Sequence, residues 1–242
     1  MSRPMPDFSP IMDAAAPADT GDIDLVIFDC DGVLIDSEII SAQTLMAALE
    51  DFGVEADFPY FKANFLGRSF PKVAANIRTT FNVNLPETFE ADYRRKLLAA
   101  FETDLKPVDG IFDILDNLGA RACVATSSSP ERASRSLHLT GLDRYFGDAV
   151  FTASMVEHGK PAPDLFLHAA ATCAARPEAC LVIEDSGPGI EAARAAGMKV
   201  WHFVGGSHLD QTDVLGQALT PPVPFFDTWA SFFDMAPQLK KR

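Results

Sequence analysis

Short, continuous apolar runs recur along the chain, and each run ends in small or polar residues. The first run is Leu25–Phe28, which Asp29 follows directly. Later runs cover residues 122–125, 149–151, 181–183 and 200–204. A short apolar run without alternation is typical of a strand that is buried on both faces. These segments are therefore predicted to be the strands of one buried sheet.

Segments with helical spacing lie between these runs. Apolar residues from Ile111 to Leu118 form one stripe, which stops at Gly119. Ser129 and Pro130 look like a helix start, because serine caps the first amide groups and proline suits the first helical position. Strands that alternate with helices predict right-handed crossovers between parallel strands. We therefore expect an α/β fold with a Rossmann-like parallel sheet covered on both faces.

The pattern changes between Asp36 and Lys106, where amphipathic helical stretches follow one another without a strand signal. This stretch is best read as a helical unit inserted after the first strand. The segment Phe225–Phe233 is expected to pack a last helix onto the core. The predicted division is a loose tail over 1–22, an α/β core over 23–36 and 107–242, and the helical insert over 37–106.

Composition narrows the class of protein further. The chain has 242 residues, of which 48% are hydrophobic, which allows a sizeable core plus a smaller second unit. Residues 1–20 lack the regions of a signal peptide, and apolar runs fall short of the ~20 residues that span a bilayer. We therefore expect a cytoplasmic protein. A net charge of −14 argues against a nucleic-acid partner, although a cleft can still bind a small anion.

Acidic side chains follow two of the predicted strands. Asp29 and Asp31 come after the first, and Glu184 and Asp185 follow the run at 181–183. Open parallel sheets bind ligands beyond the carboxyl ends of their strands, so these acids should gather there. Clustered carboxylates repel one another unless a cation neutralises them. Oxygen ligands favour a hard ion, and the sequence therefore predicts a Mg²⁺ site shared with substrate phosphate.

The spacing of Asp29 and Asp31 suits phosphoryl transfer. Residues two apart in an extended segment face the same side, so Asp29 could point at phosphorus while Asp31 stands beside it. A carboxylate nucleophile divides a difficult hydrolysis into two displacements, and a second carboxyl group can act as acid and then as base. We therefore predict Asp29 as nucleophile and Asp31 as acid/base.

Other polar residues suit a phosphate group. The hydroxyl of Thr126 and the serines that follow it, Ser127 and Ser128 above all, could bind phosphoryl oxygens, aided by the helix that starts near Pro130. Lys160 lies in a loop restricted by prolines. A cation held there would offset the carboxylates and the charge on the transferring group.

Taken together, four motifs in this order resemble those of the haloacid dehalogenase superfamily, in the branch whose helical cap is inserted after the first strand. The resemblance covers roughly residues 23–205. It implies that Asp29 and Asp185 bind Mg²⁺ through carboxylates and Asp31 through its backbone carbonyl, with Glu184 beside the metal. The motifs are 29–38 (DCDGVLIDSE), 124–126 (VAT), Lys160 in a Gly-Lys-Pro-x-Pro setting, and 183–186 (IEDS) followed by Gly189.

In similar capped enzymes, a short loop of the cap contributes to substrate specificity. Here the segment Phe65–Ser69 occupies a similar place, so Gly67, Arg68 and Ser69 are candidate substrate contacts. Arg68 could hydrogen-bond a second anionic or polyhydroxyl group of the substrate. The alternative is that Arg68 simply faces solvent.

The resemblance favours a Mg²⁺-dependent phosphatase acting on a small phosphorylated metabolite, a sugar or polyol phosphate such as a 6-phosphogluconate-like compound. A monomer or homodimer is expected. One alternative is a β-phosphoglucomutase-like mutase, although the cap-hinge histidine of those enzymes is missing from residues 38–44. A dehalogenase would lack the aspartate at the position of Asp31. A catalytically silent binding protein on the same fold is the remaining alternative.

Overall fold

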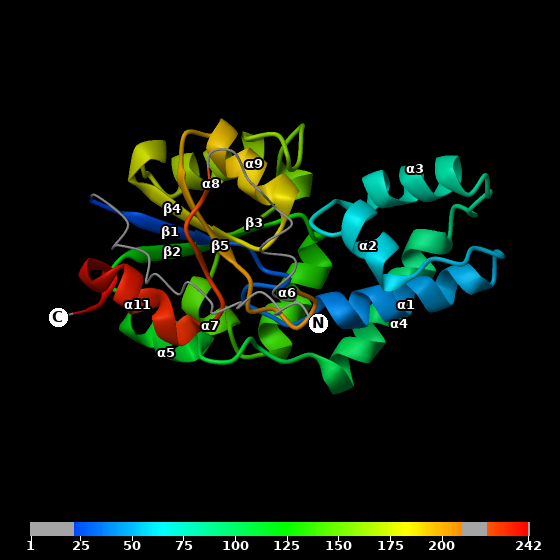
Figure 1. Ribbon diagram of the computed structural model, residues 1–242, viewed down its shortest axis with the longest axis horizontal. Coiled ribbons are helices and arrows are strands. Elements are labelled where there is room, and N and C mark those ends of the chain that lie inside the picture. Colours follow the sequence, from blue (N-terminus) through cyan, green and yellow to red (C-terminus); the bar gives the residue numbers. More distant parts are fainter. Residues whose placement is uncertain (1–21, 210–221, 242) are drawn as a thin grey trace, which may run out of the picture.

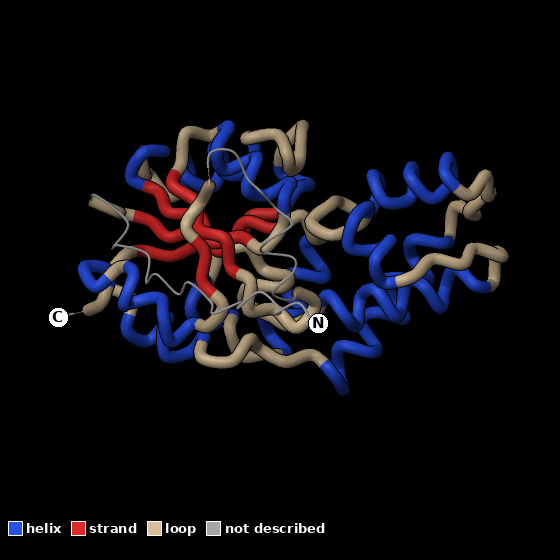
Figure 2. Tube along the Cα trace, in the orientation of Figure 1, coloured by secondary structure: helices blue, strands red, loops and turns tan. Residues whose placement is uncertain are grey.

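The computed structural model describes residues 22–209 and 222–241. Its centre is a parallel sheet with the strand order β3-β2-β1-β4-β5-β6, drawn in red between the helices in Figure 2. The chain builds outward from β1 in one direction and then returns to build from β4 in the other, so a crevice opens between β1 and β4. The predicted parallel α/β core is confirmed. The strands are β1 (Leu25–Phe28), β2 (Arg121–Thr126), β3 (Val150–Thr152), β4 (Cys180–Glu184), β5 (Lys199–Phe203) and β6 (Phe225–Phe226).

Helices cover both faces of the sheet (Figure 1). In β1, Leu25 and Ile27 pack into one apolar cluster, while Val26 and Phe28 pack into the other. Because both faces are covered, all four residues are buried, which explains the unbroken apolar run. One face carries α8 (Asp164–Thr172) and α9 (Gly187–Ala195), and the other α5 (Ile111–Asn117), α6 (Pro130–Leu139), α7 (Asp143–Phe146) and α11 (Phe232–Met235).

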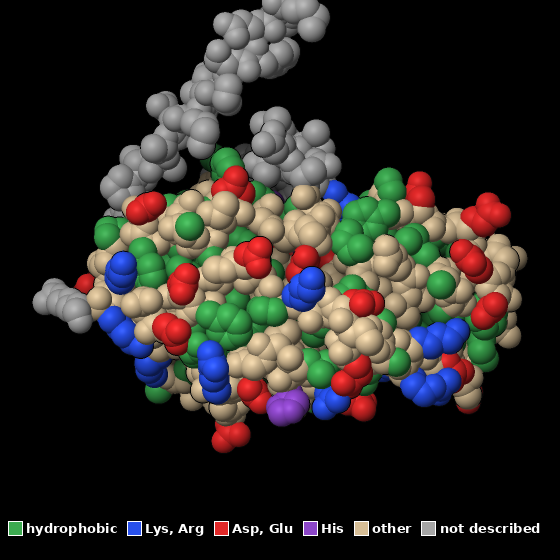
Figure 3. Space-filling model, turned by 90° about the horizontal axis from the view of Figure 1, so that it is seen from below, with side chains coloured by type: hydrophobic (Ala, Val, Ile, Leu, Met, Phe, Trp, Pro, Cys, Tyr) green, Lys and Arg blue, Asp and Glu red, His purple; other side chains and the backbone are tan. Residues whose placement is uncertain are grey.

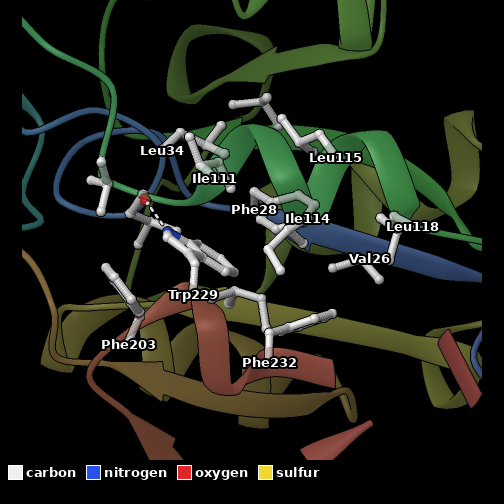
Figure 4. Close-up of a cluster of buried hydrophobic side chains, with 14 of the residues drawn as sticks. Val26, Phe28, Leu34, Ile111, Ile114, Leu115, Leu118, Phe203, Trp229 and Phe232 are labelled. Carbon is white, nitrogen blue, oxygen red and sulfur yellow. Dashed lines mark hydrogen bonds between the residues drawn. The ribbon is translucent and has the colours of Figure 1, made fainter. Parts of the chain in front are cut away.

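The aromatic segment near the C-terminus differs from the helix expected over Phe225–Phe233. Its first two residues form the edge strand β6, and only its last two, Phe232 and Phe233, belong to α11. Consecutive aromatic residues favour a strand where a sheet edge is free to pair. Trp229 and Phe232 then pack under the sheet beside Phe28 (Figure 4), and the Trp229 indole donates to the Val33 carbonyl at 3.3 Å. The segment therefore closes the second face of the core.

Four helices form the insert after β1, on the right in Figure 1. They enclose an apolar cluster of their own, which includes Leu49, Ile77, Leu97 and Phe101. We propose residues 37–106 as a cap domain over a core of 23–36 and 107–242. The helices are α1 (Glu38–Glu50), α2 (Phe58–Asn64), α3 (Phe70–Thr80) and α4 (Phe89–Asp104).

Acidic and basic side chains are interspersed over the face drawn in Figure 3, with small apolar groups between them. Neither sign of charge gathers into one large patch on this face. No helix within the described ranges is long and apolar enough to cross a membrane. The tail predicted for 1–22 lies outside the described residues except for Asp22. Short 3-10 turns complete the fold at Ala153–Met155, Pro177–Ala179, Trp229–Ser231 and Pro237–Leu239.

Candidate active site

Three predicted acids meet at the carboxyl edge of the sheet. Asp29 follows β1, Glu184 ends β4, and Asp185 comes next. One oxygen from each of these carboxylates lies within 4.8 Å of the other two, and all three side chains are buried. Because β1 and β4 are neighbours in register, Phe28 beside Ile183, the residues after them must meet. The acidic trio is therefore a direct result of the strand pairing.

Lys160 balances part of this charge. Its Nζ donates to Asp29 Oδ1 and Glu184 Oε1, both at 2.5 Å, and to the Ala125 carbonyl at 3.0 Å. Only 1% of its side chain is exposed. Burial works against the charged form, but the charges of Asp29 and Glu184 hold the pKa of Lys160 above its usual range. The lysine is thus a fixed cation between two acids.

Glu184 is held on both of its oxygens. Oε1 contacts Lys160, while Oε2 accepts from the backbone amides of Asp185 (3.0 Å) and Ser186 (2.9 Å) and from the Ser186 hydroxyl (2.9 Å). A Cβ on Gly189 would overlap the Glu184 carboxylate, so the glycine after the fourth motif leaves room for this acid. Glu184 is therefore an immobile member of the trio.

The trio keeps an excess of negative charge that a divalent cation fits. When all three carboxylates are ionised, the trio and Lys160 together carry two negative charges. Burial raises the pKa of Asp29 well above its usual range against the opposing effect of Lys160, and burial and then Glu184 raise that of Asp185. Asp185 Oδ2 is buried and has His208 Nε2 at 3.0 Å, while one oxygen of this carboxylate remains close to those of Asp29 and Glu184. An all-oxygen donor set with this charge suits Mg²⁺.

Asp31 lies apart from the trio and points toward the insert. Its Oδ1 accepts from Ser37 Oγ and from Arg132, both at 2.6 Å, and its Oδ2 accepts from Ser128 Oγ at 2.6 Å and Thr126 Oγ1 at 3.5 Å. Burial acts to raise the pKa of Asp31. Arg132 and the hydroxyls of Ser128 and Ser37 outweigh it and hold this pKa below its usual range. Asp31 is therefore an anion in this structure.

The serines after β2 connect the core to the insert. Ser127 Oγ donates to the Gly67 carbonyl at 3.2 Å, and the Ser128 amide donates to Thr126 Oγ1 at 3.1 Å. As predicted, Ser129 caps α6, where it accepts from the Arg132 amide at 3.4 Å. The candidate phosphate contacts of the core and the loop of the insert thus lie against each other.

A pocket between core and insert contains most of the predicted substrate contacts. Asp29, Asp31 and Thr126 line it from the core, and Gly67 and Arg68 from the insert. Within the described ranges, Arg68 has no carboxylate partner. The structure does not bring every candidate into the lining, since Ser69 precedes α3 and is absent from the pocket wall.

Residues that the sequence did not single out also surround the site. His208 Nε2 lies 3.0 Å from Asp185 Oδ2, and burial raises the pKa of Glu38, which also lines the pocket, to about 8. Arg132 pairs with Asp31. The sequence could have indicated Arg132, because the first turn of the helix after β2 lies at the carboxyl edge of the sheet, where ligands bind. His208 follows β5 in an irregular loop, and its contact depends on tertiary folding alone.

Known proteins match this chain over most of its length. A 6-phosphogluconate phosphatase from Escherichia coli (strain K12) is 29% identical over 188 residues, which are 77% of this chain and 85% of that protein. A fructose-1-phosphate phosphatase from the same strain is 31% identical over 176 residues, 72% and 92% of the two chains.

A solved haloacid dehalogenase-like protein of unknown function from Agrobacterium tumefaciens str. C58 superposes with a TM-score of 0.76 at 31% identity. The match covers 89% of this chain and 98% of that one. The sequence model of the haloacid dehalogenase-like hydrolases matches residues 23–197. With the sheet, the acidic trio and the buried lysine in place, the chain belongs to the haloacid dehalogenase-like hydrolase family.

Proposed function

We propose that this hydrolase is a Mg²⁺-dependent phosphatase that cleaves a small phosphate monoester through a phosphorylated Asp29. The observation that carries the proposal is the pairing of Asp29 with Lys160 inside a buried acidic trio that opens into the pocket. Two relatives named as phosphatases of sugar phosphates support a substrate of that kind.

The residues divide the reaction into two displacements. First, a carboxylate oxygen of Asp29 bonds to phosphorus, the ester P–O bond breaks, and Asp31 gives a proton to the leaving oxygen. Second, water attacks phosphorus, Asp31 accepts its proton, and Asp29 is released. Asp31 is an anion without substrate, but a phosphate dianion nearby would favour its protonation. The same residue thus acts as acid and then as base.

The remaining polar groups hold the phosphoryl group. Thr126, Ser127 and Ser128 would bind its oxygens, and Lys160 would balance the charge that develops on them. Asp29 and Asp185 would hold Mg²⁺, with Glu184 beside it and the Asp31 backbone carbonyl as the further ligand that the family resemblance implies. When bound, the ion neutralises charge on the phosphoryl oxygens and the trio.

The insert would select the substrate. Arg68 lines the pocket without a carboxylate partner, so a carboxylate or hydroxyl at the far end of the substrate could bind its guanidinium. Gly67 and Ser69 flank it, although only Gly67 reaches the pocket wall. A sugar or polyol phosphate with a distal polar group, such as 6-phosphogluconate, meets these requirements.

The test is phosphate release from a panel of sugar, polyol, nucleotide and short-acid phosphates, with Mg²⁺ and with EDTA. Metal-dependent release from a narrow group of sugar or polyol phosphates is the expected result. No release from any compound would contradict the proposal. Conversion of a sugar phosphate into its isomer without release would instead identify a mutase.

A further inference from the structure

Arg132 stands in the pocket without a part in the steps above. It is the third residue of α6, on the core side, and it belongs to none of the four motifs. Its Nη2 donates to Asp31 Oδ1 at 2.6 Å. Lys160 pairs with Asp29 and Glu184, whereas the ion-pair partner of Arg132 within the described residues is Asp31. Asp29 and Asp31 are therefore each paired with a different cation, Lys160 and Arg132.

The other contacts of Arg132 come from the cap. The same Nη2 donates to Ser41 Oγ on α1 at 2.9 Å, and the guanidinium carbon lies 5.4 Å from the centre of the Phe101 ring on α4. The Ser41 hydroxyl itself donates to the carbonyl of Ser37, whose side chain binds Asp31. Arg132 thus joins a core carboxylate to two helices of the cap.

These contacts fix the guanidinium rather than leave it mobile. Only 18% of the Arg132 side chain and 11% of the Asp31 side chain are exposed. A planar guanidinium stacked on an aromatic ring and paired with a carboxylate has little freedom to rotate. Asp31, in contrast, could turn about its two side-chain bonds if it were held by hydroxyl groups alone.

We propose that Arg132 is a positioning residue, which holds the carboxyl group of Asp31 in place for proton transfer when the cap is packed against α6. The proposal rests on the proposed function, in which Asp31 is the acid. Arg132 exchanges no proton in this proposal and acts through Asp31, whose Oδ1 it contacts. Since two of its three partners belong to the cap, cap closure and placement of the acid are coupled through this one side chain.

The consequence depends on the leaving group. When the ester P–O bond breaks, an alkoxide needs the proton of Asp31, whereas p-nitrophenolate is a weak base that leaves without it. A variant that misplaces Asp31 should therefore lose more kcat/KM for benzyl phosphate than for p-nitrophenyl phosphate. The two esters have similar size, so a defect in binding would affect both.

The experiment measures kcat/KM of the full chain with Mg²⁺ on both esters. This ratio reports the steps up to transfer of the phosphoryl group to Asp29. For Arg132→Met, kcat/KM for benzyl phosphate should fall by about 100-fold, within the range for general acid catalysis, and that for p-nitrophenyl phosphate by about 5-fold or less. Arg132→Lys keeps the positive charge but loses the planar guanidinium, so its kcat/KM for benzyl phosphate should lie between those of the wild type and Arg132→Met.

Arg135→Met is the matched control, because Arg135 lies one turn further along α6 and also joins the core to the cap, through Glu102 on α4. This variant should change kcat/KM by the same factor for both esters, or should leave both values unchanged. Ser41→Ala removes the hydrogen bond from α1 to Arg132, together with the one that Ser41 donates to the Ser37 carbonyl, and leaves the Arg132–Asp31 ion pair in place. It should cause a smaller loss on benzyl phosphate in the same direction, and it keeps the test valid if Arg132→Met does not fold.

Equal losses on the two esters in Arg132→Met and Arg132→Lys would overturn the proposal and make Arg132 a structural or binding residue. No loss on either ester would overturn it as well. A wild-type protein that hydrolyses neither ester nor any compound of the panel would overturn the proposed function itself, so the two failures are distinguishable. Combining Asp31→Asn with Arg132→Met should add no further loss on benzyl phosphate, since both act on the same proton transfer.

Discussion

The carboxyl edge of the sheet and the pocket face of the cap differ in how many partners hold their charged side chains. At the sheet edge, Lys160 and Glu184 are buried and each is held by several partners. On the cap side, Arg68 has no carboxylate partner in the described ranges, and it lines the pocket together with aromatic residues such as Phe65 and Tyr93. The groups proposed to perform the chemistry on every substrate are thus held by several partners in the core. Arg68, which is proposed to recognise the substrate, has no carboxylate partner in the described ranges and is available to bind one.

This difference has consequences for variants. A change at the sheet edge removes a partner from a buried charge, so it should affect every substrate and, in many cases, stability. A change on the cap face should affect only substrates that reach it.

The largest effect is expected for Asp29→Asn. An amide cannot act as the nucleophile, and loss of a nucleophile costs several orders of magnitude, so turnover should fall by at least about 10,000-fold on every substrate. Phosphate release measures the loss, and the melting transition should stay cooperative. Residual activity above a tenth of the wild type would contradict the role of Asp29.

Next is Lys160→Met, which leaves Asp29 and Glu184 without their shared cation. Removing one partner from a buried ion pair should lower the free energy of unfolding by about 3–5 kcal/mol, besides abolishing most of the activity. Urea denaturation measures the stability. Lys62→Met, at a half-buried position on α2 of the cap, is the control. An equal loss of stability in the two variants would contradict the role of Lys160 as the cation shared by Asp29 and Glu184.

Glu38, the first residue of α1, should make the stability of the protein depend on pH. Burial raises the pKa of Glu38 from its usual 4.5 to about 8. The protonated form is therefore favoured in the folded state, and this contribution is fully present below pH 4.5 and is lost as pH rises through about 8.

Glu38→Gln removes this dependence. Urea denaturation at pH 5 and at pH 9 measures the free energy of unfolding of both proteins. Between these pH values it should fall less for Glu38→Gln than for the wild type, and the two falls should differ by up to roughly 4 kcal/mol. Glu55→Gln, exposed in the cap, should follow the wild type. Parallel curves for Glu38→Gln and the wild type would show that Glu38 does not titrate in this range.

The smallest effect is expected on the cap face. Arg68→Ala should raise KM by about 10-fold for a sugar phosphate with a distal anionic or hydroxyl group, the value of one hydrogen bond to a charged group. KM for p-nitrophenyl phosphate should change little, because this ester has no such group. Equal changes on both substrates would show that Arg68 is not a specificity contact, and Lys62→Ala serves as the control.

The same division explains what the sequence could predict. Asp29, Thr126 and Asp185 each end or follow an apolar run, and parallel strands must bring those ends together. The strand order was not needed for that conclusion. The parallel core and the candidate trio therefore followed from local patterns and one general rule of sheet topology.

Contacts between separate elements did not follow in this way. The link of His208 to Asp185 depends on the path of an irregular loop, and the absence of Ser69 from the pocket wall depends on where α3 begins. The edge strand at Phe225 also escaped prediction, because two residues carry too little periodicity to distinguish a strand from a helix.

The most direct test of the account is a rapid-mixing measurement of p-nitrophenyl phosphate with Asp31→Asn and Mg²⁺. This ester needs no acid to form the phosphorylated enzyme, whereas in the proposed mechanism hydrolysis of that enzyme needs Asp31 as base. Asp31→Asn should release a burst of about one p-nitrophenolate per protein ahead of phosphate, and the double variant with Asp29→Asn should release none. Release of the two products in step, or a burst that survives the loss of Asp29, would contradict the proposed mechanism.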